Sequence, residues 1–162
     1  MAYVIINMGS NLGDRRLNLS RAMRAIGSRF GDFELSHAVE TTAQDFDSPN
    51  AFLNAAIMVQ TDMDPHAVLS ELQAIEKELG SGAHRNPDGS YADRLIDLDI
   101  MAIDDLTIDT PGLTVPHPRL AERRFFLEPL AELAPGWTHP LTGLSPQQML
   151  DALPPQTDTT DK

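Results

Sequence analysis

Two aspartates, Asp97 and Asp99, stand two residues apart in an otherwise apolar, β-branched run. Side chains alternate between the two faces of a strand, so both carboxylates should project from one face, and Leu98, Ile100 and Ala102 from the other. Two ionised carboxylates side by side repel each other, and a divalent cation that prefers oxygen ligands relieves that repulsion. The pair therefore predicts a metal site, and the alternative that it leaves open is a solvated polar strand face.

Cationic side chains that suit a phosphate occur at the start of this run and further along the chain. Arg94 opens the run, and His117 lies between Pro116 and Pro118, which restrict the backbone around the imidazole. Arg123 follows six residues later, and its guanidinium can bind phosphate oxygens as a fork. The alternative is a histidine that satisfies a loop carbonyl and arginines that form ion pairs on a solvated face. Together with the carboxylates, these residues predict metal-assisted phosphoryl chemistry.

The composition limits the classes of protein and ligand to consider. At 162 residues the chain fits one domain, expected over residues 1–153, followed by a polar tail over 154–162 that should be disordered. The formal net charge of -12 argues against nucleic acid as a partner. The sequence has no cysteine, no long apolar span and no leader. We therefore expect a cytoplasmic protein that makes no membrane contact. We also expect a monomer.

The hydrophobic pattern predicts alternating strands and helices. In chain order these are a strand over 3–8, a helix from Asp14 to Gly27 or Gly31, a half-buried strand from Phe33 to Val39, a strand over 52–59, a helix from Pro65 to Gly80 and a strand over 94–101. This order predicts an α+β, ferredoxin-like βαββαβ fold, an antiparallel sheet with both helices on one face. The C-terminal third, including a short helix near 145–150, should form an extension that borders the open, active-site face.

Four motifs along residues 3–137 resemble the 6-hydroxymethyl-7,8-dihydropterin pyrophosphokinase family of the folate pathway. They are GSNLGD at 9–14, FLN at 52–54, R-x-IDLDI at 94–100 and VPHPRL at 115–120, the last followed by Arg123, Phe125 and EPL at 128–130. One such motif is a weak signal, but four in the same order across a whole domain are specific. The resemblance implies transfer of the terminal diphosphate of ATP to the hydroxymethyl group of the reduced pterin, with release of AMP.

The resemblance also implies a role for each matching residue. Asp97 and Asp99 would hold two Mg²⁺ ions, and Asp97 would assist deprotonation of the substrate hydroxyl. Arg94, His117 and Arg123 would bind the phosphates of ATP. The family's further nucleotide contacts correspond to Gln73, Glu76, Ile100 and Thr114, and its pterin contacts to Gly9, Thr41, Thr42, Phe52, Asn54, Tyr91 and Phe125.

The chemistry of the residues supports these roles unequally. Asn54 is hard to explain as packing, because an amide in an apolar strand needs hydrogen-bond partners, which the lactam edge of a pterin would provide. Phe52 and Phe125, taken alone, are typical of a core. Gln73 fits a solvent-facing helix position equally well.

The loop after Gly80 departs from the family pattern. Ser81 and Ala83 stand where the family usually carries arginines, so Arg85, or His84, would have to reach the triphosphate from a shifted register. Loss of a charge-stabilising arginine can slow phosphoryl transfer by orders of magnitude. This leaves open a catalytically weak paralogue that binds pterin or nucleotide as a regulatory module. A third alternative, an RNA-binding domain of the same strand order, is opposed by the acidic charge and by the aspartate strand.

Overall fold

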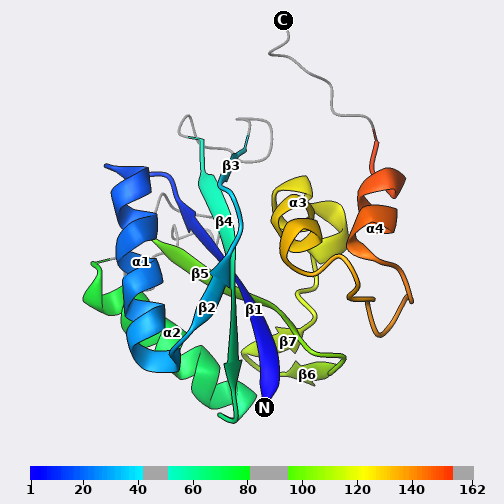
Figure 1. The fold of residues 1–162 in the computed structure, drawn as a ribbon, viewed down its shortest axis with the longest axis horizontal. Coiled ribbons are helices and arrows are strands. Elements are labelled where there is room, and N and C mark those ends of the chain that lie inside the picture. Colours follow the sequence, from blue (N-terminus) through cyan, green and yellow to red (C-terminus); the bar gives the residue numbers. More distant parts are fainter. Residues whose placement is uncertain (42–50, 81–94, 155–162) are drawn as a thin grey trace, which may run out of the picture.

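The central feature of the fold is a five-stranded antiparallel sheet (Figure 1). The structure, a computed structural model, describes residues 1–41, 51–80 and 95–154. The strands of the sheet are β1 (Ala2–Ser10), β2 (Phe33–Leu35), β3 (Val39–Glu40), β4 (Leu53–Thr61) and β5 (Asp97–Ile103). They follow the order β2-β4-β1-β5, with β3 also paired to β4. β1 therefore lies between β4 and β5, and β5 forms one edge of the sheet.

Two helices cover one face of the sheet, α1 (Arg15–Phe30) and α2 (Pro65–Glu78) (Figure 1). Asp14 caps α1 by accepting a hydrogen bond from the backbone N–H of Leu17, and Gly31, with a φ of 90°, ends it. Asp64 caps α2, whose first residue is proline. Both predicted helix starts are confirmed. The apolar stripes of the two helices pack on the alternate residues of β1 that face them, which are Val4, Ile6 and Met8.

The chain after β5 first forms β6 (Ile108–Thr110) and β7 (Leu113–Val115), whose Leu113 and Val115 belong to the core on the helix side of the sheet. The rest of the C-terminal third lies on the other face of the sheet and comprises a 3-10 turn at Leu120–Glu122, α3 (Arg124–Leu133) and α4 (Pro146–Ala152). Figure 1 shows α3 and α4 on the side of the sheet away from α1 and α2. A second apolar cluster joins Ile5 and Met101 of the sheet to Phe126, Leu130 and Met149. The predicted ferredoxin-like α+β fold with a C-terminal extension over the second face is confirmed.

A β-bulge in the pairing of β1 with β5 changes which residues share a face. Ile5 pairs with Ala102, but Ile6 pairs with Ile100, so one residue of β5, Met101, is extra at this point. Ala102 therefore faces the same side as Ile5, toward α3 and α4. The prediction that Ala102 shares the face of Leu98 and Ile100 is wrong, because simple alternation does not include a bulge.

The predicted half-buried strand from Phe33 to Val39 is confirmed as a continuous strand only over its first three residues, and its predicted burial is wrong. β2 ends at Leu35, and its side chains are exposed. Ser36 interrupts the ladder, because the Ala56 backbone N–H donates to Ser36 Oγ, at 2.8 Å, rather than to a carbonyl. His37 then points outward, and its backbone N–H and Nδ1 both lie 2.9 Å from the Glu132 carboxylate.

Among the described residues, none of the helices combines the length and the apolar composition required to cross a membrane.

Candidate active site

The candidate site lies where β1, β4 and β5 run side by side, on the face turned toward α3. Pairing places Gly9 of β1 between Asn54 of β4 and Asp97 of β5. Two residues earlier on the same face, Asn7 pairs with Asp99. The side chains around this cavity are those of Asn7, Phe52, Asn54, Asp97, Asp99, Arg123, Phe125 and Phe126, with Gly9 at its floor. The structure thus brings together residues from four separate segments of the chain.

Gly9 is required by the close approach of its neighbours. A Cβ at this position would lie 2.9 Å from Asn54 Oδ1 and 3.3 Å from a ring carbon of Phe52. Phe52 is itself held through its backbone, because its N–H donates to Thr41 Oγ1 and its carbonyl accepts from the Thr41 N–H, both at 2.9 Å. Thr41 therefore positions the aromatic ring that lines the cavity.

Two buried amides face each other across the strands at the centre of the site. Asn7 Nδ2 donates to Asn54 Oδ1 at 3.1 Å, and the two residues are 3% and 2% exposed. Within the described part of the chain, neither Asn7 Oδ1 nor Asn54 Nδ2 has a hydrogen-bond partner. An unsatisfied buried polar atom costs about 1–3 kcal/mol. One free acceptor and one free donor therefore face a cavity in which a ligand can satisfy both.

Asn7 was missed by sequence reasoning, although a signal was present. Asn7 lies two residues before Gly9 on β1, so strand alternation places both on one face of the sheet, as it does for Asp97 and Asp99 on β5. An amide in an otherwise apolar strand needs a partner there just as Asn54 does.

The two aspartates share one face of β5, as predicted, and both are half-buried. No cluster of three or more acidic, histidine or cysteine side chains that could hold a metal forms within the described ranges. Two carboxylates offer hard oxygen ligands and leave most of a coordination shell for water and phosphate oxygens, which is how Mg²⁺ is usually bound. The residues present therefore fit Mg²⁺, and Asp97 and Asp99 would hold it.

His117 is oriented by its backbone and its ring. Its N–H donates to the carbonyl of Met101, the bulge residue of β5, at 3.0 Å. Nδ1 accepts from the Arg119 N–H at 3.1 Å, so the proton of the neutral ring is on Nε2. Burial, and after it the charges of Arg123 and Arg119, lowers the pKa of His117 from 6.5 to about 4. At neutral pH the imidazole is thus a neutral N–H donor.

Arg123 lies at the start of α3 and lines the cavity. Its guanidinium carbon is 5.6 Å from the ring centroid of Phe125 and 5.3 Å from that of Phe126. His117 also meets the Phe126 ring edge to face, at 4.9 Å. Arg123 and His117 therefore flank one aromatic pair beside the cavity, the grouping predicted for phosphate contacts.

The four further residues expected to contact the nucleotide do not line this cavity. Glu76 of α2 accepts a hydrogen bond from the Leu98 backbone N–H at 2.7 Å, so its carboxylate ties α2 to the outer edge of β5. Gln73 is exposed on α2, and Thr114 is exposed on β7. The Ile100 side chain packs in the core on the helix side of the sheet, so Ile100 can reach a nucleotide only through its backbone.

Four predicted site residues lie outside the described residues, namely Thr42, Arg85, Tyr91 and Arg94. His84, the alternative loop contact, also lies outside them.

Comparison with known proteins gives consistent matches. The model of the 7,8-dihydro-6-hydroxymethylpterin-pyrophosphokinase (HPPK) family matches residues 5–135. A 2-amino-4-hydroxy-6-hydroxymethyldihydropteridine pyrophosphokinase of Porphyromonas gingivalis is 41% identical over 142 residues, which cover 86% of this chain and 95% of the relative. The protein of the same name in Bacillus subtilis is 36% identical over 135 residues, covering 82% and 77% of the two chains.

Solved structures agree on the fold. Plasmodium falciparum HPPK-DHPS, crystallised with pterin and p-hydroxybenzoate, superposes with a TM-score of 0.70 at 14% identity, covering 93% of this chain. This chain spans 43% of that longer one. By its family match and its curated relatives, the chain belongs to the 7,8-dihydro-6-hydroxymethylpterin-pyrophosphokinase family.

Proposed function

We propose that this protein transfers the terminal diphosphate of ATP to the hydroxymethyl group of 6-hydroxymethyl-7,8-dihydropterin, with release of AMP. Membership of the family makes the chain a pyrophosphokinase of folate biosynthesis, an ATP-dependent diphosphotransferase. The assignment of a pterin as the substrate rests on the pair of unsatisfied amide atoms of Asn7 and Asn54, which are buried beside two carboxylates.

The pterin is flat, aromatic and edged by donors and acceptors. Its lactam edge would accept from Asn54 Nδ2, and an N–H of the ring system would donate to Asn7 Oδ1. Phe52 and Phe125 are the aromatic side chains that would enclose the ring faces. Gly9 leaves the room that this close approach requires.

Asp97 and Asp99 would hold Mg²⁺, two ions by the family resemblance, and the metal supplies charge stabilisation for the phosphoryl oxygens. The substrate hydroxyl oxygen would attack the β-phosphorus in line, and the bond from that phosphorus to the α–β bridging oxygen breaks, so AMP leaves with the electron pair. Asp97 would take the hydroxyl proton. No covalent nucleophile is needed, because such transfers depend on positioning and charge stabilisation.

The phosphates would be bound by the cationic side of the site. Arg123 offers a guanidinium fork, and His117 offers its Nε2 proton. We assign Arg94 and Arg85 to the same task on the strength of their sequence positions.

The outer edge of β5 is suited to the nucleotide base. Leu98 directs its N–H toward this edge, where Glu76 binds it. Because backbone groups of a strand alternate in direction with a period of two, the N–H and carbonyl of Ile100 face the same edge. An adenine could therefore pair with the Ile100 backbone, with Gln73, Glu76 and Thr114 around it. We further propose that the site holds two Mg²⁺ ions. The protein would be a cytoplasmic monomer with a single folded unit over residues 1–153.

Incubation of the purified protein with Mg²⁺, ATP and the reduced pterin tests the function. We expect AMP and the pterin diphosphate in equal amounts, and loss of both in Asp97→Ala. Asp105→Ala, an exposed aspartate in the turn after β5, is the matched control and should leave turnover unchanged. Binding of pterin without AMP release would contradict the proposal and favour the regulatory module.

A further inference from the structure

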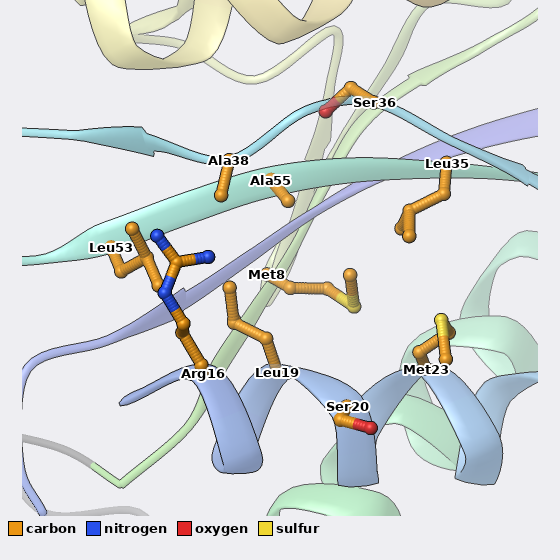
Figure 2. A pocket seen from close by; sticks show the side chains of 10 residues that line it. All are labelled: Met8, Arg16, Leu19, Ser20, Met23, Leu35, Ser36, Ala38, Leu53 and Ala55. Carbon is orange, nitrogen blue, oxygen red and sulfur yellow. The ribbon is translucent and has the colours of Figure 1, made fainter. Parts of the chain in front are cut away.

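A second pocket lies on the opposite face of the sheet from the candidate active site. Its walls are α1, the start of β4 and the segment that joins β2 to β3 (Figure 2). Met8, Leu53 and Ala55 form its floor, and these residues alternate along β1 and β4 with Gly9 and Asn54 of the active site. The pocket is therefore separated from the active site by the thickness of the sheet.

The lining of this back pocket is apolar with one charge. Leu19, Met23 and Leu35 line it together with the apolar floor, and among the described residues Arg16 alone contributes a charge. Ser36 has its hydroxyl occupied, because it donates to the His37 carbonyl and accepts from the Ala56 N–H. In Figure 2 the Arg16 side chain rises from α1 toward Leu53 and Ala38 at one end of the pocket.

No neighbour within the described ranges neutralises the charge of Arg16. α1 contains arginines and no acidic residue, and of these Arg15 pairs with Glu40 and Arg29 pairs with Glu71 and Glu78. Within the described segments no carboxylate or other acceptor pairs with Arg16. A guanidinium at the end of an apolar pocket favours an anionic group attached to an apolar body.

The size of the pocket selects a small molecule. Its volume is about 260 Å³, just under the roughly 300–1,000 Å³ of sites that hold drug-sized ligands. We propose that the back pocket binds a small amphipathic monocarboxylate, with the apolar body between α1 and β4 and the carboxylate on Arg16.

Octanoate is a suitable probe, and methionine methyl groups are suitable reporters. In protein labelled with ¹³C at methionine methyls, Met8 and Met23 line the pocket, whereas Met101 and Met149 pack on the other face of the sheet. Titration with octanoate should shift the first pair and leave the second unchanged. Shifts confined to Met101 and Met149, or no shifts up to the solubility limit, would overturn the proposal.

Two comparisons test the role of the Arg16 charge, one between ligands of different charge and one between protein variants. Octanoate should bind more tightly than 1-octanol, and octylamine more weakly than either. Arg16→Gln should weaken octanoate by about tenfold, the value of one charge-assisted hydrogen bond, and leave 1-octanol unchanged. Arg21→Gln, on the exposed side of the same helix, should change neither. Equal affinities of the wild type for octanoate and octylamine would overturn the anionic assignment.

The location is tested separately from the catalytic function. Ala38→Leu fills the pocket from an exposed position and should abolish octanoate binding while the protein stays folded. Saturating Mg²⁺-ATP and pterin should leave octanoate binding in place, because the sheet separates the two sites. Competition between octanoate and pterin would overturn the location, whatever the fate of the proposed function.

Discussion

Replacing both buried amides by leucine should make the free protein more stable and weaken its binding of pterin. In the wild type, Asn7 Oδ1 and Asn54 Nδ2 are unsatisfied, and one hydrogen bond joins the two residues. Each unsatisfied atom costs about 1–3 kcal/mol and the bond contributes about 1 kcal/mol. Asn7→Leu/Asn54→Leu, whose side chains keep the same branching, should therefore raise the free energy of unfolding by about 1–5 kcal/mol.

The single variants should behave differently from the double. Asn54→Leu removes one unsatisfied atom but leaves Asn7 Nδ2 without its acceptor, so its stability should change little. The same argument applies to Asn7→Leu, and the stabilisation should appear only in the double variant, as a coupling energy of a few kcal/mol in a double-mutant cycle.

Urea unfolding without substrates, and pterin binding by calorimetry, measure the two effects. For a chain of this length each kcal/mol corresponds to about 2–4 °C in melting temperature, so the double variant should melt several degrees higher. Gln60→Leu, an exposed amide on β4, is the control and should be close to neutral. A double variant no more stable than the wild type, at an unchanged denaturant m value, would refute the reasoning that these atoms are unsatisfied.

Three further substitutions test other parts of the site. Gly9→Ala should displace the Asn54 amide, because the new Cβ would lie 2.9 Å from its oxygen. Loss of one buried hydrogen bond should weaken pterin binding about tenfold or more. The control is Gly136→Ala, which has open space around it and should have no effect. The lowered pKa of His117 means that the unfolded chain binds more protons than the folded one between pH 6.5 and about 4. The free energy of unfolding should therefore rise with pH across that window by up to about 3 kcal/mol. Urea unfolding at several pH values should show this slope as the difference in unfolding free energy between the wild type and His117→Asn. A difference that does not depend on pH would contradict the prediction. Glu76→Ala should lower stability by about 1–2 kcal/mol because it leaves a strand N–H without its acceptor, whereas Glu76→Gln keeps an acceptor and should lose less; equal losses would show that the hydrogen bond is not the cause.

Local sequence signals predicted the elements whose physics is local. Asp14 and Asp64 are caps that need only the adjacent backbone, and Gly31 ends α1 with a positive φ that suits glycine. The shared face of Asp97 and Asp99 follows from strand alternation alone. These predictions held because none of them depends on which strand lies next to which.

The predictions that failed depend on pairing between distant segments. The exposure of Phe33 and Leu35 reflects an edge position next to β4, which no pattern within residues 33–39 reveals. The hydrogen bond from the Leu98 N–H to Glu76 has the same kind of cause, because it forms only once α2 is packed beside β5. The nucleotide contact of Glu76 that the family resemblance implies stays a prediction.

The bulge in β5 explains how one edge strand serves two purposes. Up to Ile100 the strand alternates, so the carboxylates face the cavity and the apolar residues face α1 and α2. The extra residue, Met101, packs with α3 and α4, and its carbonyl accepts the His117 N–H at 3.0 Å. In a regular ladder, the step from Ile100 to Ile103 would have put Ile103 on the cavity side, but the bulge returns it to the helix-side core. The bulge therefore joins the half of β5 that carries Asp97 and Asp99 to the segment that carries His117, and a single-residue deletion at Met101 should disturb both.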